Sequence, residues 1–299
     1  MIGLVLALLA GFCLAASFVF LRRGVHRSGE ISSTIPIFSF VGLVIFGLPV
    51  FISGELARLT SLTWLGVGSL AGAGVVHFIL GRISGFTSVR LIGANRAVPI
   101  YTCNLLIAVM LGILFLGEPL TISLFAAVVL IFGGIVLIST RGGSEKQSKD
   151  TPEDSLAMGV LTALGAALCW GISPFLVKIG LREVDSPLLA AFISYAAASV
   201  IIGIWLLPPK NSEKLRHVDR SSLAPIIIAA VTMALAHLLR YTALHYSALT
   251  MVQPLFTTQA LFVFPLSFLI NRQIEAFSLR IILGAISVVT GVFLIFWIG

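Results

Sequence analysis

The sequence predicts an all-α membrane protein in which ten transmembrane helices form two inverted five-helix repeats. Hydrophobic residues make up 58% of the chain and charged residues only 10%, whereas a soluble domain carries about a quarter charged residues. Ten apolar stretches each approach the ~20 residues that a helix needs to cross ~30 Å of hydrocarbon. The stretches form two related sets of five, and an odd number of crossings inverts the second set relative to the first.

The ten stretches follow one another along the chain, and each is taken as one predicted helix. They cover roughly residues 2–21, 34–53, 62–84, 89–116, 120–139, 156–178, 187–207, 222–244, 247–270 and 277–298. Helices are expected because a helix satisfies its own backbone groups in lipid, and the alternation typical of barrel strands is absent. Basic residues follow the first stretch and do not precede it, so we interpret it as a retained helix and not as a secretory signal.

A polar segment, RGGSEKQSKDTPEDS at 141–155, divides the ten stretches into two sets. We therefore predict a first five-helix repeat over 1–140, a linker over 141–155 and a second five-helix repeat over 156–299. A shift of 156 residues places Ser17 on Ser173, and a shift of 160 residues places His77 on His237. Similar offsets in several stretches indicate an internal duplication.

Basic residues concentrate on one side of the predicted membrane. Fourteen of the nineteen lysines and arginines follow odd-numbered stretches, four follow even-numbered stretches, and Arg96 lies within the fourth stretch. The fourteen include Arg82 and Arg90, which we assign to the link after the third stretch. Because lysine and arginine favour cytoplasmic links, the count places both termini outside. We expect a multi-pass protein of the plasma (inner) membrane.

Three passages have the pattern of a known transporter family. The first is LCWGISPFLVKIGL at 168–181, with a degenerate partner, FCLAASFVFLRRGV, at 12–25. The second is LFLGEPLTISLFAAVVLIFGGIVLI at 114–138, echoed by LINRQIEAFSLRIILGAISVVTGVFLI at 269–295. Together with RYTALHYSALTMVQPLF at 240–256, these passages resemble the EamA-type halves of the drug/metabolite transporter superfamily.

The resemblance implies a ten-helix basket. Its central cavity would be lined by the first, third, fourth, sixth, eighth and ninth stretches, with the fifth and tenth at the periphery. Members of the superfamily move amino acids, nucleotide sugars, sugar phosphates and other small metabolites. The chain departs from the family pattern at 81–99, where GRISGFTSVRLIGANRAVP replaces the usual aromatic-Ala-Leu stretch and adds Arg96.

The charged residues favour an anionic or zwitterionic solute. All twelve acidic residues lie in links or at the ends of stretches, whereas a cation pump usually needs a carboxylate at membrane depth. Arg96, beside Asn95, lies within the fourth stretch, where an arginine needs a partner or a water-filled cavity. Its guanidinium group could bind a carboxylate or phosphate in a bidentate manner; alternatively, it extends to lipid headgroups. Its counterpart in the second half is Gln253.

Two histidines, His77 and His237, occupy equivalent positions in the two halves. They are candidates for proton coupling, because imidazole titrates near neutral pH. Arg240 and Tyr241 follow His237 at i+3 and i+4, so the three side chains share one face of a helix. We expect this face to line the binding site; alternatively, each histidine is hydrogen-bonded to a backbone carbonyl.

Further candidate substrate-binding residues are Trp170, Asn104, Ser17 and Ser173. The two serines belong to stripes of small residues in the first and sixth stretches, and such stripes favour close helix packing. Glu118 is expected to cap or turn the link before the fifth stretch.

These features predict a transporter that moves a small metabolite by alternating access, most simply an anionic or zwitterionic solute such as an amino acid or a phosphorylated compound. The alternatives are efflux of neutral or cationic compounds, and a non-transporting assembly or sensor subunit. The HExxH, GxSxG and Walker signatures of enzymes are absent, so no enzymatic activity is predicted. No motif indicates a cofactor, a metal or nucleic acid as a partner. The expected partners are a small-molecule substrate and the lipid bilayer, and a homodimer is possible.

Overall fold

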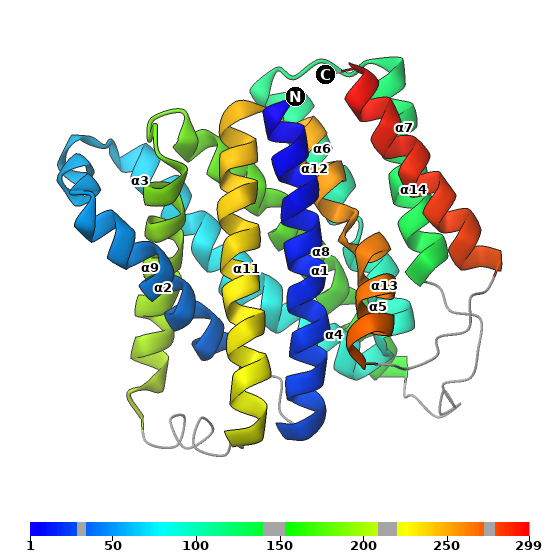
Figure 1. Cartoon of the computed structure of the whole chain (residues 1–299), viewed down its shortest axis with the longest axis horizontal. Coiled ribbons are helices and arrows are strands. Elements are labelled where there is room, and N and C mark those ends of the chain that lie inside the picture. The colour runs from blue at the N-terminus through cyan, green and yellow to red at the C-terminus, as the bar shows by residue number, and fades with distance from the viewer. Residues whose placement is uncertain (29–33, 140–152, 209–219, 272–278, 299) are drawn as a thin grey trace.

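A computed structural model of the chain describes residues 1–28, 34–139, 153–208, 220–271 and 279–298, and the regular elements in these ranges are all helices (Figure 1). Before the linker they are α1 (Ile2–Ser28), α2 (Thr34–Ile52), η1 (Glu55–Ser61), α3 (Trp64–Val75), η2 (Val76–Gly81), α4 (Arg82–Ile92), α5 (Ala94–Tyr101), α6 (Asn104–Leu116) and α7 (Ile122–Ser139). After it they are α8 (Glu153–Leu181), α9 (Pro187–Leu206), α11 (Arg220–Tyr246), α12 (Leu249–Thr257), α13 (Gln259–Asn271) and α14 (Leu279–Ile298).

Seven helical stretches of the described ranges are long and apolar enough to cross a membrane. They are Ile2–Gly24, Thr34–Ile52, Trp64–Ile92, Arg96–Leu116, Leu156–Leu181, Pro187–Leu206 and Ser222–Tyr246. Three shorter apolar helices, Ile122–Ile138, Leu249–Val263 and Ile282–Trp297, lie where the fifth, ninth and tenth stretches are predicted. The predicted fold class, an all-α multi-pass membrane protein, is confirmed.

The predicted boundary between the third and fourth stretches is wrong. Helical structure continues without a break through α3, η2 and α4, from Trp64 to Ile92, and so passes the predicted end at 84. It ends at Gly93, whose φ of 75° lies in the left-handed region that glycine tolerates best. The next helix, α5, begins at Ala94 and not at 89. Arg82 and Arg90 therefore belong to a helix, and the assignment of both to a link is corrected.

Three apolar spans contain an interruption of their α-helical geometry. The third span, Trp64–Ile92, contains a π-helix, η2, in its middle. The fourth breaks between α5 and α6 shortly after Pro99, and the ninth breaks between α12 and α13 shortly after Pro254. Proline removes a backbone donor from a helix, and π-turns and broken helices are common at functional sites of membrane proteins.

Helices of the two halves pack against each other throughout the bundle. In Figure 1, α1 and α11 lie side by side, and α7 and α14 form a pair at one edge. Helix α1 also packs against α12 and α13, and α8 packs against α3, η2, α4, α5 and α6. Helix α2 packs against α9. The core of the protein is therefore built mainly between the halves.

Small residues permit this close packing. The Ser17 hydroxyl of α1 donates to the Ala229 carbonyl of α11 over 2.7 Å. A Cβ added to Gly159 of α8 would lie 2.2 Å from a side-chain carbon of Ile92. A Cβ added to Gly134 of α7 would lie 2.6 Å from a backbone oxygen of α14. The prediction that the small-residue stripes of the first and sixth stretches pack helices is confirmed.

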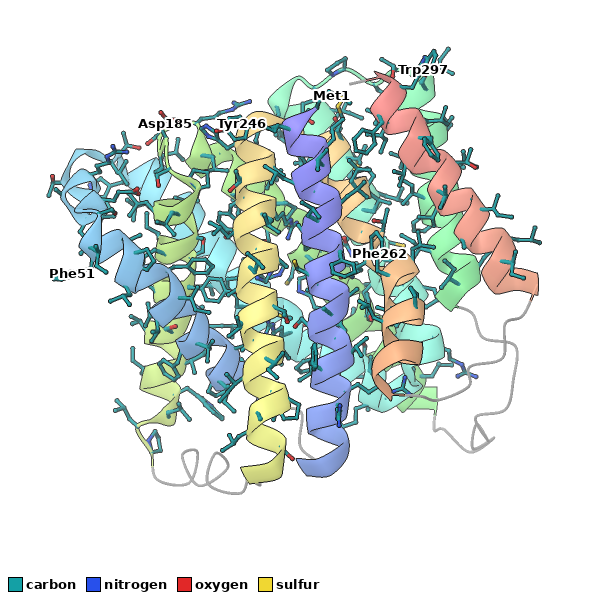
Figure 2. The ribbon with its side chains drawn as sticks, in the orientation of Figure 1. Met1, Phe51, Asp185, Tyr246, Phe262 and Trp297 are labelled. Atoms are coloured by element: carbon teal, nitrogen blue, oxygen red, sulfur yellow. The ribbon has the colours of Figure 1, made fainter. Side chains whose placement is uncertain are left out.

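One end of the bundle carries both chain ends. Met1, Asp185, Tyr246 and Trp297 all lie at this end (Figure 2). It also includes the turn between α11 and α12, because Gly3 of α1 lies directly against Ser247 of that turn. We call this end the termini side.

Candidate functional site

Three polar aromatic side chains from three helices form a chain, two members of which are buried and one, His77, half-buried; we call it the histidine cluster. It consists of Tyr195 on α9, His237 on α11 and His77 on η2. The Tyr195 hydroxyl lies 2.8 Å from Nδ1 of His237, and Nε2 of His237 lies 3.3 Å from Nε2 of His77. The two histidines that the internal repeat places at equivalent positions are therefore in direct contact.

The π-helix positions His77, and Trp170 of α8 covers it. Nε1 of Trp170 donates to the backbone oxygen of His77 over 3.3 Å. The indole lies so close to η2 and α4 that a Cβ at Gly81 would be 2.5 Å, and at Gly85 2.6 Å, from its ring atoms. Tyr101 of α5 also contacts the indole, with its ring centroid 5.1 Å from that of Trp170 in an edge-to-face arrangement. Glycines spaced four apart thus allow an aromatic wall beside the histidine cluster.

A second group of polar side chains, the arginine cluster, links the two broken helices to α11. The Arg240 guanidinium donates to Oε1 of Gln253 on α12 over 2.7 Å. Nε2 of Gln253 donates to Oδ1 of Asn104, the first residue of α6, over 3.0 Å. The Asn104 amide in turn donates to the backbone oxygen of Tyr101 over 2.7 Å, across the break between α5 and α6.

The two buried arginines have no acidic partner in the described part of the chain. Arg240 is 3% exposed, and its guanidinium carbon lies 4.3 Å from the ring centroid of Phe256. Arg82 is 7% exposed, donates to the sulfur of Met233 and lies 4.8 Å from the ring centroid of Phe38. Sulfur and aromatic faces compensate a positive charge only weakly compared with a carboxylate. The region therefore carries an uncompensated positive charge.

Polar atoms in both clusters lack a hydrogen-bond partner. Nδ1 of His77 and Nε of Arg240 are buried and unpaired among the described residues, as is Oε1 of Gln259 at the start of α13. Buried polar groups are nearly always paired, and an unpaired one costs about 1–3 kcal/mol. The unpaired atoms of His77 and Arg240 are therefore hydrogen-bonding positions that no described residue fills.

The other predicted site residues occupy different surroundings. Tyr241 donates its hydroxyl to Ser194 of α9 over 2.9 Å. Ser17 bonds to a carbonyl of α11, and Ser173 is buried within α8. Arg96, near the start of α5, has an exposed side chain, unlike the arginines of the core. The side chain of Asn95 lies outside the described residues.

Sequence reasoning missed Arg82 and Tyr195. Arg82 was assigned to a link because hydropathy decreases after residue 80, which suggests the end of a span, although no proline occurs between residue 80 and Pro99. Tyr195 is the only tyrosine in the seventh apolar stretch, and that singularity was the available signal. A Cβ at Gly42 of α2 would lie 2.0 Å from its ring, so a glycine in another helix provides the space for it.

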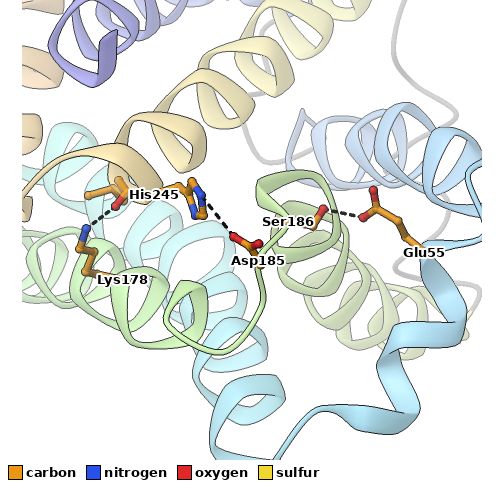
Figure 3. Close-up of polar contacts among 6 residues, drawn as sticks. Glu55, Lys178, Asp185, Ser186 and His245 are labelled. Atoms are coloured by element: carbon orange, nitrogen blue, oxygen red, sulfur yellow. Dashed lines mark hydrogen bonds and ion pairs between the residues drawn. The ribbon is translucent and has the colours of Figure 1, made fainter. Parts of the chain in front are cut away.

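At the termini side, hydrogen bonds join links of the two halves. The Ser186 hydroxyl, which caps α9, donates to Glu55 of η1 (Figure 3). The Thr63 hydroxyl, which caps α3, donates to Glu183 in the link between α8 and α9. Each bond connects a residue before the linker with one after it.

Two charged side chains hold the turn between α11 and α12. Gly117, with φ of 69°, ends α6 and positions Glu118, whose two carboxylate oxygens each accept a backbone N–H at the start of α12 over 2.7 Å. Lys178 of α8 donates to the Leu244 carbonyl near the end of α11 and to the Ser247 carbonyl in the turn, and Figure 3 shows one of these two bonds. His245 of α11 lies 3.4 Å from Asp185 (Figure 3). Glu118 thus caps a helix of the other half, and not the link before α7 as predicted.

Comparisons with known proteins agree on the type of protein. The model of the EamA-like transporter family matches residues 1–140 and 157–297. An uncharacterized transporter of Methanothermobacter thermautotrophicus is 26% identical over 206 residues, which make up 69% of this chain and 57% of that relative. The match thus spans little more than half the length of that curated relative. One solved structure, described only as the crystal structure of a protein, has the same fold at 16% identity, with a TM-score of 0.68 over 98% of this chain and 96% of the other.

Proposed function

Because this chain belongs to the EamA-like transporter family, we propose that it moves a small anionic or zwitterionic solute, such as an amino acid or a phosphorylated compound, by alternating access around the histidine and arginine clusters. That it is a multi-pass membrane protein and a transporter follows from the family and from the apolar helices. The family is one of transporters and not of enzymes.

The buried guanidinium of Arg240 is the observation that carries the proposed solute class. It has one neutral side-chain partner, Gln253, and an unpaired Nε, with no carboxylate in contact among the described residues. An arginine at membrane depth needs a partner or a water-filled cavity. A carboxylate or phosphate of the solute would supply that partner and form charge-assisted hydrogen bonds with the guanidinium. Arg82 adds a second positive charge that disfavours cationic solutes.

We assign Arg96 a secondary role. Its side chain is exposed, which suits contact with lipid headgroups or with an anion on its way to the buried site. Gln253 is the counterpart of Arg96 in the second half, and it contacts Arg240 directly. We therefore propose that Arg240, and not Arg96, binds the carboxylate or phosphate of the solute.

The arrangement of the helices supports two inverted repeats, 1–140 and 156–299. Helix α1 packs against α11 and against α12 and α13, as α8 packs against the α3–α4 span and against α5 and α6. The start of α1 and the end of α8 both lie at the turn after α11, because Gly3 and Lys178 each contact Ser247. Equivalent helices therefore run in opposite directions, as inversion requires.

The termini side is proposed to be closed in this conformation. Hydrogen bonds from Ser186 to Glu55, from Thr63 to Glu183 and from the first N–H groups of α12 to Glu118 all cross between the halves there. Rocking of one half against the other would break them and open a path to the clusters. From the positive-inside distribution, this side faces outward, in a plasma (inner) membrane.

A ligand screen on the purified protein tests the solute class. Thermal unfolding is measured with L-amino acids, glucose 6-phosphate, nucleotides and tetraphenylphosphonium, for wild type, Arg240→Gln, Arg240→Lys and Arg96→Gln. A ligand that binds the folded state raises the midpoint by mass action. We expect anionic or zwitterionic compounds to stabilise wild type and Arg96→Gln. Arg240→Gln should lose about tenfold or more in affinity, as expected for a hydrogen bond to a charged group.

Three results would contradict the proposal. Stabilisation by tetraphenylphosphonium alone would favour efflux of cationic compounds. An unchanged response of Arg240→Gln would remove Arg240 from the site, and a loss of response in Arg96→Gln alone would place the clamp at Arg96. The unliganded midpoint of each variant shows whether it is folded, and Arg240→Lys separates the need for a charge from the need for the guanidinium fork.

A further inference from the structure

We infer that the His77–His237 pair is a proton-binding site whose occupancy is coupled to anion binding at Arg240, so that the solute crosses together with a proton. The inference rests on the proposed function, because it adds the coupling ion to that transport cycle. Its basis is the contact between the two imidazoles, the open nitrogen at one end of the histidine cluster and the cations that face it.

The histidine cluster contains one shared proton position in each of its two contacts. If the Tyr195 hydroxyl donates to Nδ1 of His237, then Nε2 of His237 carries its hydrogen and donates to Nε2 of His77. If Nδ1 of His237 donates to Tyr195 instead, then Nε2 of His77 donates to His237. Both arrangements use every ring nitrogen of His237 and leave only one ring nitrogen of His77 unassigned.

That remaining nitrogen, Nδ1 of His77, is where the cluster can gain or lose a proton. It is buried and has no partner among the described residues. In the first arrangement it carries a hydrogen without an acceptor, and in the second it is a bare acceptor. A proton added there in the second arrangement gives an imidazolium that keeps its Nε2 hydrogen bond to His237. The same proton leaves from Nδ1 when the site faces the other side.

The charges around the pair determine when that proton binds. Arg240 and Arg82 are the charged side chains that act on both histidines, and Tyr195 and Tyr241 are the neutral titratable groups in the same region. No described carboxylate contacts the pair. A proton would thus add a third positive charge to the site. An anion at Arg240 cancels one of the three, so the solute favours the proton and, by reciprocity, the proton favours the solute.

Transport in proteoliposomes measures this coupling. Liposomes contain a pH-sensitive dye, and a mixture of radiolabelled L-amino acids is added outside to wild type, His237→Gln and His245→Gln. We expect the interior of wild-type liposomes to acidify with about one proton per solute. In His237→Gln the ratio of protons to solute should decrease severalfold, whatever flux remains. His245→Gln, which alters a histidine at the termini side, should keep the wild-type ratio.

Solute flux without acidification in wild type would overturn the inference, and so would an unchanged ratio in His237→Gln. If no labelled amino acid moves in wild type, amino acids are excluded as the solute, and a measurement without solute decides about the proton site. For this, 15N-histidine spectra of wild type and Arg240→Gln are recorded between pH 8 and pH 4.5.

The coupling predicts a specific pattern in those spectra. In Arg240→Gln, His77 and His237 should respond in one shared step, because interacting groups titrate as a pair. That step should occur at a higher pH than any response of the pair in wild type. The difference in midpoint should correspond to a change in proton affinity of roughly 5–150-fold, which is typical of coupling between linked sites. The proton site is overturned if the two histidines respond independently, or if neither responds in Arg240→Gln.

Discussion

The contact between α3 and α9 makes Gly74→Ala a quantitative test of the architecture around the site. A Cβ at Gly74 would lie 2.0 Å from the backbone oxygen of Ser194, far below ordinary van der Waals contact. Backbone atoms cannot rotate away, so the two helices must separate. The separation must exceed roughly 1 Å, because a normal contact between a carbon and an oxygen atom is ~3.5 Å. Ser194 accepts the Tyr241 hydroxyl and precedes Tyr195, so this separation would also disturb the histidine cluster.

Two effects set the magnitude. Overpacking costs about 1–3 kcal/mol, whereas alanine gains about 1 kcal/mol over glycine in a helix. We therefore expect Gly74→Ala to destabilise the protein by up to about 2 kcal/mol. Gly68→Ala on the same helix is the matched control, because a Cβ there meets nothing within 4 Å. It should be neutral or stabilise by up to about 1 kcal/mol.

Thermal unfolding in detergent, followed by tryptophan fluorescence at a fixed scan rate, compares the two variants. The unfolding midpoint is expected to be highest for Gly68→Ala, intermediate for wild type and lowest for Gly74→Ala. Equal midpoints for the two variants would refute the reasoning, because they would mean that α3 and α9 do not approach as closely as described.

Three further changes have expected outcomes. Glu118→Gln keeps one acceptor for the two N–H groups of α12 but loses the other and the charge, so thermal unfolding should show a loss of about 1–2 kcal/mol. Tyr195→Phe removes the hydroxyl from Nδ1 of His237, which should cost about 1–3 kcal/mol and change the 15N shift of that nitrogen; an unchanged shift would contradict the contact. Gly85→Ala places a Cβ 2.6 Å from the Trp170 ring and should shift the tryptophan emission, whereas identical spectra would show that the indole lies elsewhere.

The sequence predicted the helices well because hydropathy and length reflect the thickness of the bilayer directly. The stretches at 34–53 and 187–207, for example, correspond to α2 over Thr34–Ile52 and α9 over Pro187–Leu206. The error at the third stretch arose because its second part, RISGFTSVRLI, is polar enough to resemble a link. Helical structure persists there because α8 packs against α4, and a sequence pattern does not reveal that contact.

The candidate site was predicted only in part for the same reason. The internal repeat identified His77 and His237 as equivalent, but only the fold shows that their rings touch. Arg240 and Gln253 were both candidates, yet their hydrogen bond joins two different helices. Arg96 attracted attention because it lies farther from the end of its predicted stretch than any other arginine, while Arg82, two residues before the end of its stretch, was assigned to a link. Burial of an arginine depends on neighbouring helices, and sequence position alone does not determine it.

A reversible cross-link at the termini side tests the proposed transport cycle most directly. A Cβ at Gly66 of α3 would lie 3.4 Å from the Cβ of Glu183 in the other half, close to the ~3.5–4.5 Å of a disulfide. The double variant Gly66→Cys/Glu183→Cys is made with Cys13, Cys103 and Cys169 replaced by serine, beside each single variant. In proteoliposomes, uptake of labelled L-amino acids should be abolished by oxidation of the double variant and restored by reduction, while the single variants are unaffected. Equal uptake by the oxidised and reduced double variant would contradict alternating access through this face.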